Sequence, residues 1–329
     1  MIVAGAAGVL ASSITNDPVR ASSETDVAAS KSLGAKKNIR AGVLDVGYFE
    51  SGPANGRPVI LLHGFPYDVH SYVEVAPDLA RQGYRVIVPH LRGHGSTVFS
   101  ERDTPRSGQQ AAIGEDLRDL LDALKIDKAV LAGYDWGGRA ACVAAALWPE
   151  RCVGLVSVNS YLIQDIAKSK QPAPAKVERG FWYQFYFQTE RGQAGLKEHR
   201  RDIAKLMWRD NSPTWKFDDA TFDRSAASFD NDDYVDVVIH SYRHRLAGAP
   251  GFSRYDTLED RLARQPAITV PTVTLDGDSD GVIAATDGKS SAPRFSGKRV
   301  HRIVEGIGHN LPQEAPGAFA EAVRQVSTL

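Results

Sequence analysis

The strongest constraint on this chain is the segment 130–138, which reads Val-Leu-Ala-Gly-Tyr-Asp-Trp-Gly-Gly. An apolar run leads into Asp135, small residues lie before and after it, and a helix-like stretch follows at 139–148. Small residues allow the backbone to turn sharply enough to present one side chain at the end of a strand. The sequence therefore predicts a strand, a very tight turn and a helix, with Asp135 at the apex of the turn.

A carboxylate at this apex restricts the chemistry. The residue at such a turn is usually serine, which attacks a carbonyl carbon. A carboxylate instead displaces a leaving group from carbon and forms an alkyl ester. Asp135 therefore argues against ordinary ester hydrolysis, and favours opening an epoxide or expelling a halide.

Strand and helix patterns alternate along most of the chain. Predicted strands cover 42–49, 58–62, 84–88, 128–132, 153–158, 269–275 and 299–304, and predicted helices cover 73–82, 107–125, 139–148 and 314–326. This alternation predicts an α/β fold with a mostly parallel sheet and helices on both faces.

The alternation stops in the middle of the chain. Residues 164–265 contain no convincing β run and are rich in aromatic and charged residues, so we expect a mainly helical cap inserted over the carboxyl edge of the sheet. The predicted organisation is an N-terminal extension at 1–40, a first core part at 41–163, this cap, and a second core part at 266–329.

Composition bounds the class of protein. A chain of 329 residues that is 43% hydrophobic can bury one large core with an inserted smaller piece. The net charge is -1 and no polybasic block occurs, which argues against a nucleic-acid partner. No apolar stretch approaches the roughly 20 residues needed to span a bilayer. A homodimer is compatible with these features, and we expect neither a metal nor a cofactor.

The first forty residues leave two alternatives open. Residues 1–10 are small and apolar, and a small-residue cleavage site lies near Ala21. If residues 1–21 are a truncated signal peptide, the protein is exported to the periplasm. However, a signal peptide requires a positively charged residue before its apolar part, and no Lys or Arg occurs there. Otherwise this segment is a simple extension and the protein is cytoplasmic.

Two further residues are expected to act with Asp135. A nucleophile at such a turn is followed in the chain by an acid and then by a histidine. His309 lies in a glycine-rich loop between the last predicted strand and the last helix, which places it at the same sheet edge. The acid should follow the preceding strand, where Asp280 is favoured because it lies three residues after Gly277. Asp278 is the alternative acid.

An oxyanion hole is expected beside the turn. The loop after the second predicted strand reads His-Gly-Phe-Pro at 63–66. The backbone N–H groups of Phe65 and Trp136 can hold an oxyanion together. A cis bond between Phe65 and Pro66 is also expected. His63 and His94 are interpreted as structural residues.

These motifs resemble a known family. Asp135 with Trp-Gly-Gly at 136–138, the loop 63–66 and His309 are similar to the α/β-hydrolase fold epoxide hydrolases and to the related haloalkane and fluoroacetate dehalogenases. The resemblance covers the chain from about Ala41 to its end. It implies an α/β-hydrolase fold with a catalytic triad and no cofactor.

The resemblance also implies two catalytic tyrosines in the cap. The segment 183–188, Tyr-Gln-Phe-Tyr-Phe-Gln, is similar to the soluble epoxide hydrolase pattern, whose first tyrosine corresponds to Tyr183. Tyr242 followed by Arg243 is similar to the Tyr-Arg pair that contains the second catalytic tyrosine of these enzymes. Two phenols would supply hydrogen bonds where an alkoxide develops as an epoxide opens. The expected substrates are a small apolar epoxide and water, and the expected product is a vicinal diol.

Two other functions stay open. A haloalkane or haloacid dehalogenase would use the same Asp-His-Asp triad. The Trp136 indole suits halide binding in a haloalkane dehalogenase. A fluoroacetate dehalogenase requires an arginine at this position, although Arg139 matches a second arginine of that family. A non-catalytic binding protein of this fold is the alternative from another class.

Overall fold

The computed structural model describes residues 33–329, and the predicted signal segment 1–21 lies outside them. One boundary prediction was wrong. Strand β1 covers Ala35–Ala41, so the folded core begins within the stretch predicted as an extension. β1 is an edge strand whose side chains are mostly exposed, and it reads Ala-Lys-Lys-Asn-Ile-Arg-Ala. Such an edge needs no apolar pattern, and lysines discourage pairing with other chains, so the sequence carried no strand signal there.

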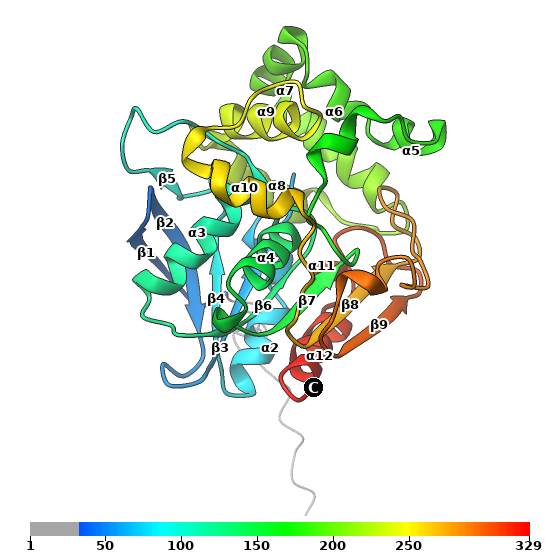
Figure 1. Ribbon diagram of the computed structural model, residues 1–329. Coiled ribbons are helices and arrows are strands. Elements are labelled where there is room, and N and C mark those ends of the chain that lie inside the picture. The colour runs from blue at the N-terminus through cyan, green and yellow to red at the C-terminus, as the bar shows by residue number, and fades with distance from the viewer. Residues whose placement is uncertain (1–32) are drawn as a thin grey trace, which may run out of the picture.

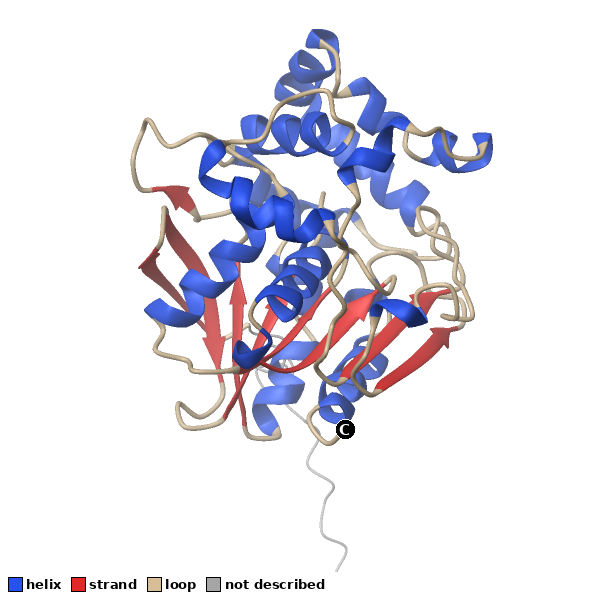
Figure 2. Cartoon of the chain, in the orientation of Figure 1, coloured by secondary structure: helices blue, strands red, loops and turns tan. Residues whose placement is uncertain are grey.

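One twisted sheet forms the centre of the molecule (Figure 2). Its strand order is β1-β2-β4-β3-β6-β7-β8-β9, and the short β5 (Val98–Phe99) pairs with β2. The other strands are β2 (Leu44–Ser51), β3 (Arg57–Leu62), β4 (Tyr84–Pro89), β6 (Ala129–Gly133), β7 (Cys152–Val158), β8 (Thr272–Gly277) and β9 (Arg299–Val304). Strands β1 and β2 are antiparallel to their neighbours, and the pairs from β4 to β9 are parallel.

Helices cover both faces of the sheet, as the alternating pattern predicts. Helices α3 (Gln110–Ala123) and α4 (Asp135–Leu147) pack together on one face, and α2 (Val75–Arg81) and α12 (Pro316–Val326) pack together on the other (Figure 1). β3, β6 and β8 are almost completely buried, as expected of parallel strands between two helical layers.

The segment 164–265 is helical and lies above the carboxyl ends of the parallel strands (Figure 1). Its α-helices are α5 (Ala175–Gly180), α6 (Trp182–Tyr186), α7 (Glu190–Asn211), α8 (Asp219–Ala226), α9 (Tyr234–Arg245) and α10 (Asp256–Ala263). Within residues 33–329, no helix is both long and apolar enough to cross a bilayer.

A buried ion pair joins the loop after β4 to α3. Arg92 is fully buried, and its Nε and Nη2 lie 2.6 Å from the two carboxylate oxygens of Asp116. Arg92 also donates to the carbonyl of Ser107 at 2.6 Å. Every nitrogen of this guanidinium has a hydrogen-bond acceptor, so Arg92 is satisfied entirely by the fold.

Replacing Arg92 with leucine should lower the free energy of unfolding by about 3 kcal/mol, because the Asp116 carboxylate loses its counterion in a poorly hydrated site. Urea denaturation would measure this loss. Arg118→Leu is the matched control, since Arg118 is 31% exposed and its pair with Asp119 is weaker. A loss below about 1 kcal/mol for Arg92→Leu would contradict the structural role.

Candidate active site

Asp135 lies at the apex of a strained turn between β6 and α4. Its φ of 49° is in the left-handed region, which is uncommon for residues other than glycine. The turn is possible because its glycines pack closely: a Cβ at Gly137 would collide with the Leu62 carbonyl, and a Cβ at Gly133 would collide with the backbone of Gly137. The small residues of segment 130–138 are therefore a steric requirement of this turn.

The Asp135 carboxylate has two different neighbours. Its Oδ1 accepts a hydrogen bond from the backbone N–H of Phe65 at 2.7 Å. Its Oδ2 lies 3.7 Å from Nε2 of His309. Burial raises the pKa of Asp135, but the hydrogen bond and charge of His309, with the Phe65 N–H, outweigh burial and hold the pKa below its usual value. Asp135 is therefore ionised at neutral pH.

Asp280, the favoured acid, contacts the histidine. Its Oδ2 lies 2.8 Å from Nδ1 of His309, and its Oδ1 accepts from the backbone N–H groups of Val282 and Ile283 at 2.7 and 3.0 Å. The Asn159 side chain donates to Oδ2 at 3.1 Å. These four bonds fix the carboxylate against the imidazole ring.

Asp278, the alternative acid, has a different place. Its Oδ1 accepts from the backbone N–H of Gly306 at 2.7 Å and from the hydroxyl of Ser279 at 3.0 Å, on the exposed side of the loop. Asp278 therefore ties together the loops after β8 and β9.

The loop that carries His309 is held from the other side by residues that the sequence analysis missed. Glu314 accepts from the backbone N–H groups of Gly308 and Asn310, at 2.8 and 3.0 Å. It also accepts from the hydroxyl of Ser212 at 2.6 Å, and that hydroxyl in turn accepts from the N–H of His309. No motif identifies these residues, because Ser212 comes from the cap, about 100 residues earlier in the chain.

The imidazole of His309 lies between two carboxylates. Burial alone would lower its pKa, but the charge of Asp280, the hydrogen bonds to Asp135 and Asp280 and the charge of Asp135 together raise it to about 10. The resting site therefore contains an imidazolium flanked by two carboxylates.

The two expected oxyanion donors meet at the turn. The backbone N–H of Phe65 donates to the Asp135 carboxylate. The bond between Phe65 and Pro66 is cis, as expected. Trp136 lies in the first turn of α4, where backbone N–H groups have no acceptor within the helix. The Phe65 ring stacks on the Trp136 indole, with ring centroids 5.3 Å apart.

Both cap tyrosines reach the same place. Tyr183 is in α6, Tyr242 is in α9, and their ring centroids lie 5.3 Å apart in an edge-to-face arrangement. The hydroxyl of Tyr242 accepts a hydrogen bond from Nε1 of Trp136 at 3.2 Å, and that of Tyr183 accepts from Nε2 of Gln184 at 3.4 Å. Both oxygens act as acceptors in these two contacts, so neither contact uses a hydroxyl proton, and a side-chain hydrogen bond between Tyr242 and Tyr183 acts to lower the pKa of Tyr183.

Both phenols are neutral at physiological pH. Burial, followed by the charge of Asp135, raises the pKa of Tyr183 to about 12. Burial, followed by the charges of Tyr183 and Asp135, also raises the pKa of Tyr242 above its ordinary value. The charge of Asp135 contributes to both shifts, and Trp136, the residue after Asp135, is bonded to the hydroxyl of Tyr242.

The two histidines interpreted as structural, His63 and His94, each have a backbone partner in the fold. Nε2 of His63 accepts from the backbone N–H of Leu91 at 3.1 Å, and its Nδ1 therefore donates to the carbonyl of Gly64 at 2.9 Å. His94 is fully buried and bonds through Nδ1 to the carbonyl of Arg92. These contacts agree with the structural interpretation of both residues.

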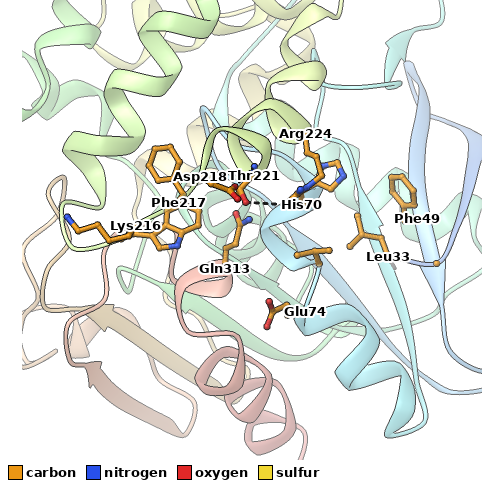
Figure 3. A pocket seen from close by; sticks show the side chains of 13 residues that line it. Leu33, Phe49, His70, Glu74, Lys216, Phe217, Asp218, Thr221, Arg224 and Gln313 are labelled. Atoms are coloured by element: carbon orange, nitrogen blue, oxygen red, sulfur yellow. Dashed lines mark hydrogen bonds between the residues drawn. The ribbon is translucent and has the colours of Figure 1, made fainter. Parts of the chain in front are cut away.

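Several cavities lie at the interface of cap and core. The largest, about 720 Å³, is bounded by His70, Phe217, Arg224 and Gln313 (Figure 3), and Asp135 is not part of its wall. Two others adjoin the tyrosines: one of about 430 Å³ includes Tyr183, and one of about 560 Å³ includes Gln184. Of the candidate site residues, Tyr183 of α6 lines the first of these two cavities, and Asp135 and His309 line neither.

Comparisons with known proteins agree with this geometry. The family model described as alpha/beta hydrolase fold matches residues 57–315. The chain belongs to the alpha/beta hydrolase fold family. Among relatives of this α/β-hydrolase, Epoxide hydrolase A from Mycobacterium tuberculosis is 26% identical over 307 residues, which cover 85% of this chain and 92% of the relative.

Solved structures extend the likeness. The crystal structure of a candidate epoxide hydrolase from Klebsiella pneumoniae subsp. pneumoniae is 49% identical to this α/β-hydrolase, with a TM-score of 0.88 over 89% of this chain and 97% of that one. Epoxide Hydrolase A from Mycobacterium thermoresistibile, at 21% identity and a TM-score of 0.70 over 89% and 97% of the two chains, shares the fold. The predicted fold class and family are confirmed.

The raised pKa of His309 makes stability depend on pH. Because the folded value of about 10 exceeds the ordinary 6.5, the folded protein keeps a proton that the unfolded chain loses. This contribution is complete below pH 6.5 and disappears as the pH rises through 10. The excess stability of the wild type over His309→Gln should therefore shrink across this range in urea denaturation at several pH values. An excess that does not change with pH would contradict the shift.

Proposed function

We propose that this α/β-hydrolase is an epoxide hydrolase in which residues 164–265 are the cap and Asp135, His309 and Asp280 are the catalytic triad. The observation that carries the proposal is that two buried phenols, Tyr183 and Tyr242, meet above the turn that carries Asp135, where the Trp136 indole is bonded to Tyr242. The names of the relatives support the same activity.

The first step opens the ring. A carboxylate oxygen of Asp135 attacks an epoxide carbon, the C–O bond breaks, and the developing alkoxide receives hydrogen bonds from Tyr183 and Tyr242. One phenol transfers its proton to that oxygen. This step produces a hydroxyalkyl ester of Asp135, and it needs neutral phenols, which the raised pKa values provide.

The second step hydrolyses the ester. Once Asp135 is esterified, its negative charge is gone, and with it part of the cause that holds the pKa of His309 near 10. The imidazolium can then release its proton, which restores the phenolate left by ring opening to a phenol, and the neutral imidazole becomes a base, still oriented by Asp280. His309 takes a proton from water, whose oxygen attacks the Asp135 carboxyl carbon, and the N–H groups of Phe65 and Trp136 hold the oxyanion. As the intermediate collapses, the bond between the Asp135 carboxyl carbon and the alkyl oxygen breaks, and that oxygen takes the proton from His309. A vicinal diol leaves, and the Asp135 carboxyl group returns its proton to the imidazole.

The dehalogenase alternative is less well supported by the contacts. A halide would need the indole N–H of Trp136, but that N–H donates to Tyr242. The two phenols would also have no function in halide release. The non-catalytic alternative is disfavoured by the bonded triad, because a protein that only binds a ligand has no need for an oriented Asp280–His309 pair.

The assigned reaction can be tested with two substrates. Styrene oxide should give phenylethanediol, whereas a 1-haloalkane of similar size should give little halide. Diol formation is measured by chromatography and halide by ion-selective electrode. Asp135→Asn is the control that should abolish diol formation. Halide release without diol would overturn the epoxide assignment and favour a dehalogenase.

The roles of the base and the phenols can be separated in the His309→Gln protein. His309→Gln should accumulate the Asp135 ester with styrene oxide, seen as a mass increase of the protein, because water is no longer activated. Adding Tyr242→Phe should slow the appearance of this ester about 100-fold, since one donor to the alkoxide is lost.

Tyr186→Phe in the same background is the matched control, because Tyr186 belongs to the same helix as Tyr183 but its hydroxyl lies against Gly195. It should leave the rate unchanged. Ester formation at the same rate in the Tyr242→Phe protein would contradict the role of this phenol.

A further inference from the structure

The C-terminal end of the cap helix α7 contacts the acid loop and the base loop of the proposed triad together. The backbone carbonyl of Asn211 accepts hydrogen bonds from the N–H of Gly281 at 2.9 Å and from the N–H of His309 at 3.3 Å. Gly281 directly follows Asp280, so one carbonyl of the cap joins the two loops. The fit is close, because a Cβ at Gly281 would collide with the backbone carbonyl of Asp210.

Ser212, the next residue, extends this contact along the base loop. Its side chain is buried, and its Oγ accepts from the backbone N–H groups of His309 and Asn310 at 3.0 and 3.5 Å. The same hydroxyl donates to Glu314 at 2.6 Å. A hydroxyl has one proton and two lone pairs, and all three are used here. Ser212 is therefore committed entirely to the segment that carries the base.

Glu314 holds the same segment from the core. It ends α11 (Leu311–Glu314), and its two carboxylate oxygens accept from the N–H groups of Gly308 and Asn310. With Ser212, it binds the backbone N–H groups of three consecutive residues, of which His309 is the middle one. Bonds to a carboxylate are stronger than bonds between neutral groups. We call Ser212 and Glu314 the loop clamp.

The proposed reaction removes one of the forces that hold the imidazole. In the resting protein, Nδ1 of His309 lies 2.8 Å from Asp280, and Nε2 lies 3.7 Å from the carboxylate of Asp135. Once Asp135 is an ester, its charge no longer attracts the ring. The ring must then point at a water molecule beside that ester. Its position at this stage depends on Asp280 and on the backbone that carries it.

We propose that Ser212 and Glu314 are positioning residues for the second step, which hold the backbone of His309 so that the imidazole stays aimed at the Asp135 ester. The proposal rests on the proposed function. A displacement of about 1 Å in a reacting group can slow a reaction about 100-fold. The clamp therefore acts on the rate of ester hydrolysis.

Ring opening does not require the clamp. The attacking carboxylate of Asp135 is oriented by its own turn and by the N–H of Phe65. The developing alkoxide receives its hydrogen bonds from Tyr183 and Tyr242, and His309 transfers no proton in this step. Loss of the clamp should therefore separate the two steps kinetically, whereas a general loss of structure would slow both.

The test measures the two steps separately in Ser212→Ala. Rapid mixing with excess styrene oxide, followed by protein mass spectrometry, gives the rate of ester formation, which should equal that of the wild type. The ester protein, freed of styrene oxide, should release diol about tenfold more slowly than the wild-type ester. Glu314→Gln, which keeps the size of the side chain, should give the same result and replaces Ser212→Ala if the latter does not fold.

Thr214→Val is the matched control. The hydroxyl of Thr214 also links the cap to the base loop, because it donates to the carbonyl of Gly306 at 2.9 Å. This bond lies three residues before His309, so its loss should change neither rate. Equal slowing of diol release in Thr214→Val would overturn the proposal. Unchanged diol release in Ser212→Ala or Glu314→Gln, or slower ester formation in both, would also overturn it.

Failure of the proposed function can be recognised separately. If the wild type forms neither ester nor diol from styrene oxide, the epoxide assignment is wrong. The clamp is then tested by the low-field proton NMR resonance of the His309–Asp280 hydrogen bond, assigned by its loss in Asp280→Asn. Broadening of this resonance in Ser212→Ala but not in Thr214→Val would support the positioning role. A resonance that is absent from the wild type, or unchanged in Ser212→Ala, would overturn it.

Discussion

The positive φ of Asp135 is the constraint on which the rest of the site depends. It is possible only where the backbones of β3, β6 and α4 approach so closely that no Cβ fits at Gly133 or Gly137. That approach is created by the buried parallel strands on either side. The packing of the sheet therefore fixes the backbone that presents the carboxylate.

Parallel strands bring the other groups to the same edge, each on the loop that follows its own strand. Asp280 follows β8 and His309 follows β9, and both reach the Asp135 turn because parallel strands end side by side. The cap then completes the site from above, through Tyr183, Tyr242 and the Ser212 hydroxyl that holds the His309 loop. Core and cap are thus joined by hydrogen bonds at the site itself.

Sequence reasoning succeeded where a residue type and its spacing are forced by local geometry. The glycines around Asp135 and the position of His309 are of this kind. It failed at β1, whose mostly exposed polar residues satisfy an edge strand without an apolar pattern. It also missed Glu314 and Asn159, because a carboxylate or amide that holds a loop can come from any element nearby, and only the three-dimensional arrangement decides which one does.

Trp136 takes part in two interactions that belong to different layers of the molecule. Its indole is bonded to Tyr242 in the cap and stacked on Phe65 in the core, while its backbone belongs to the turn that presents Asp135. A cap of different sequence could therefore not be placed on this core freely. Any replacement cap must offer a hydrogen-bond acceptor to the Trp136 indole, or the core must change as well. The amino-acid sequences of cap and core are therefore constrained to change together.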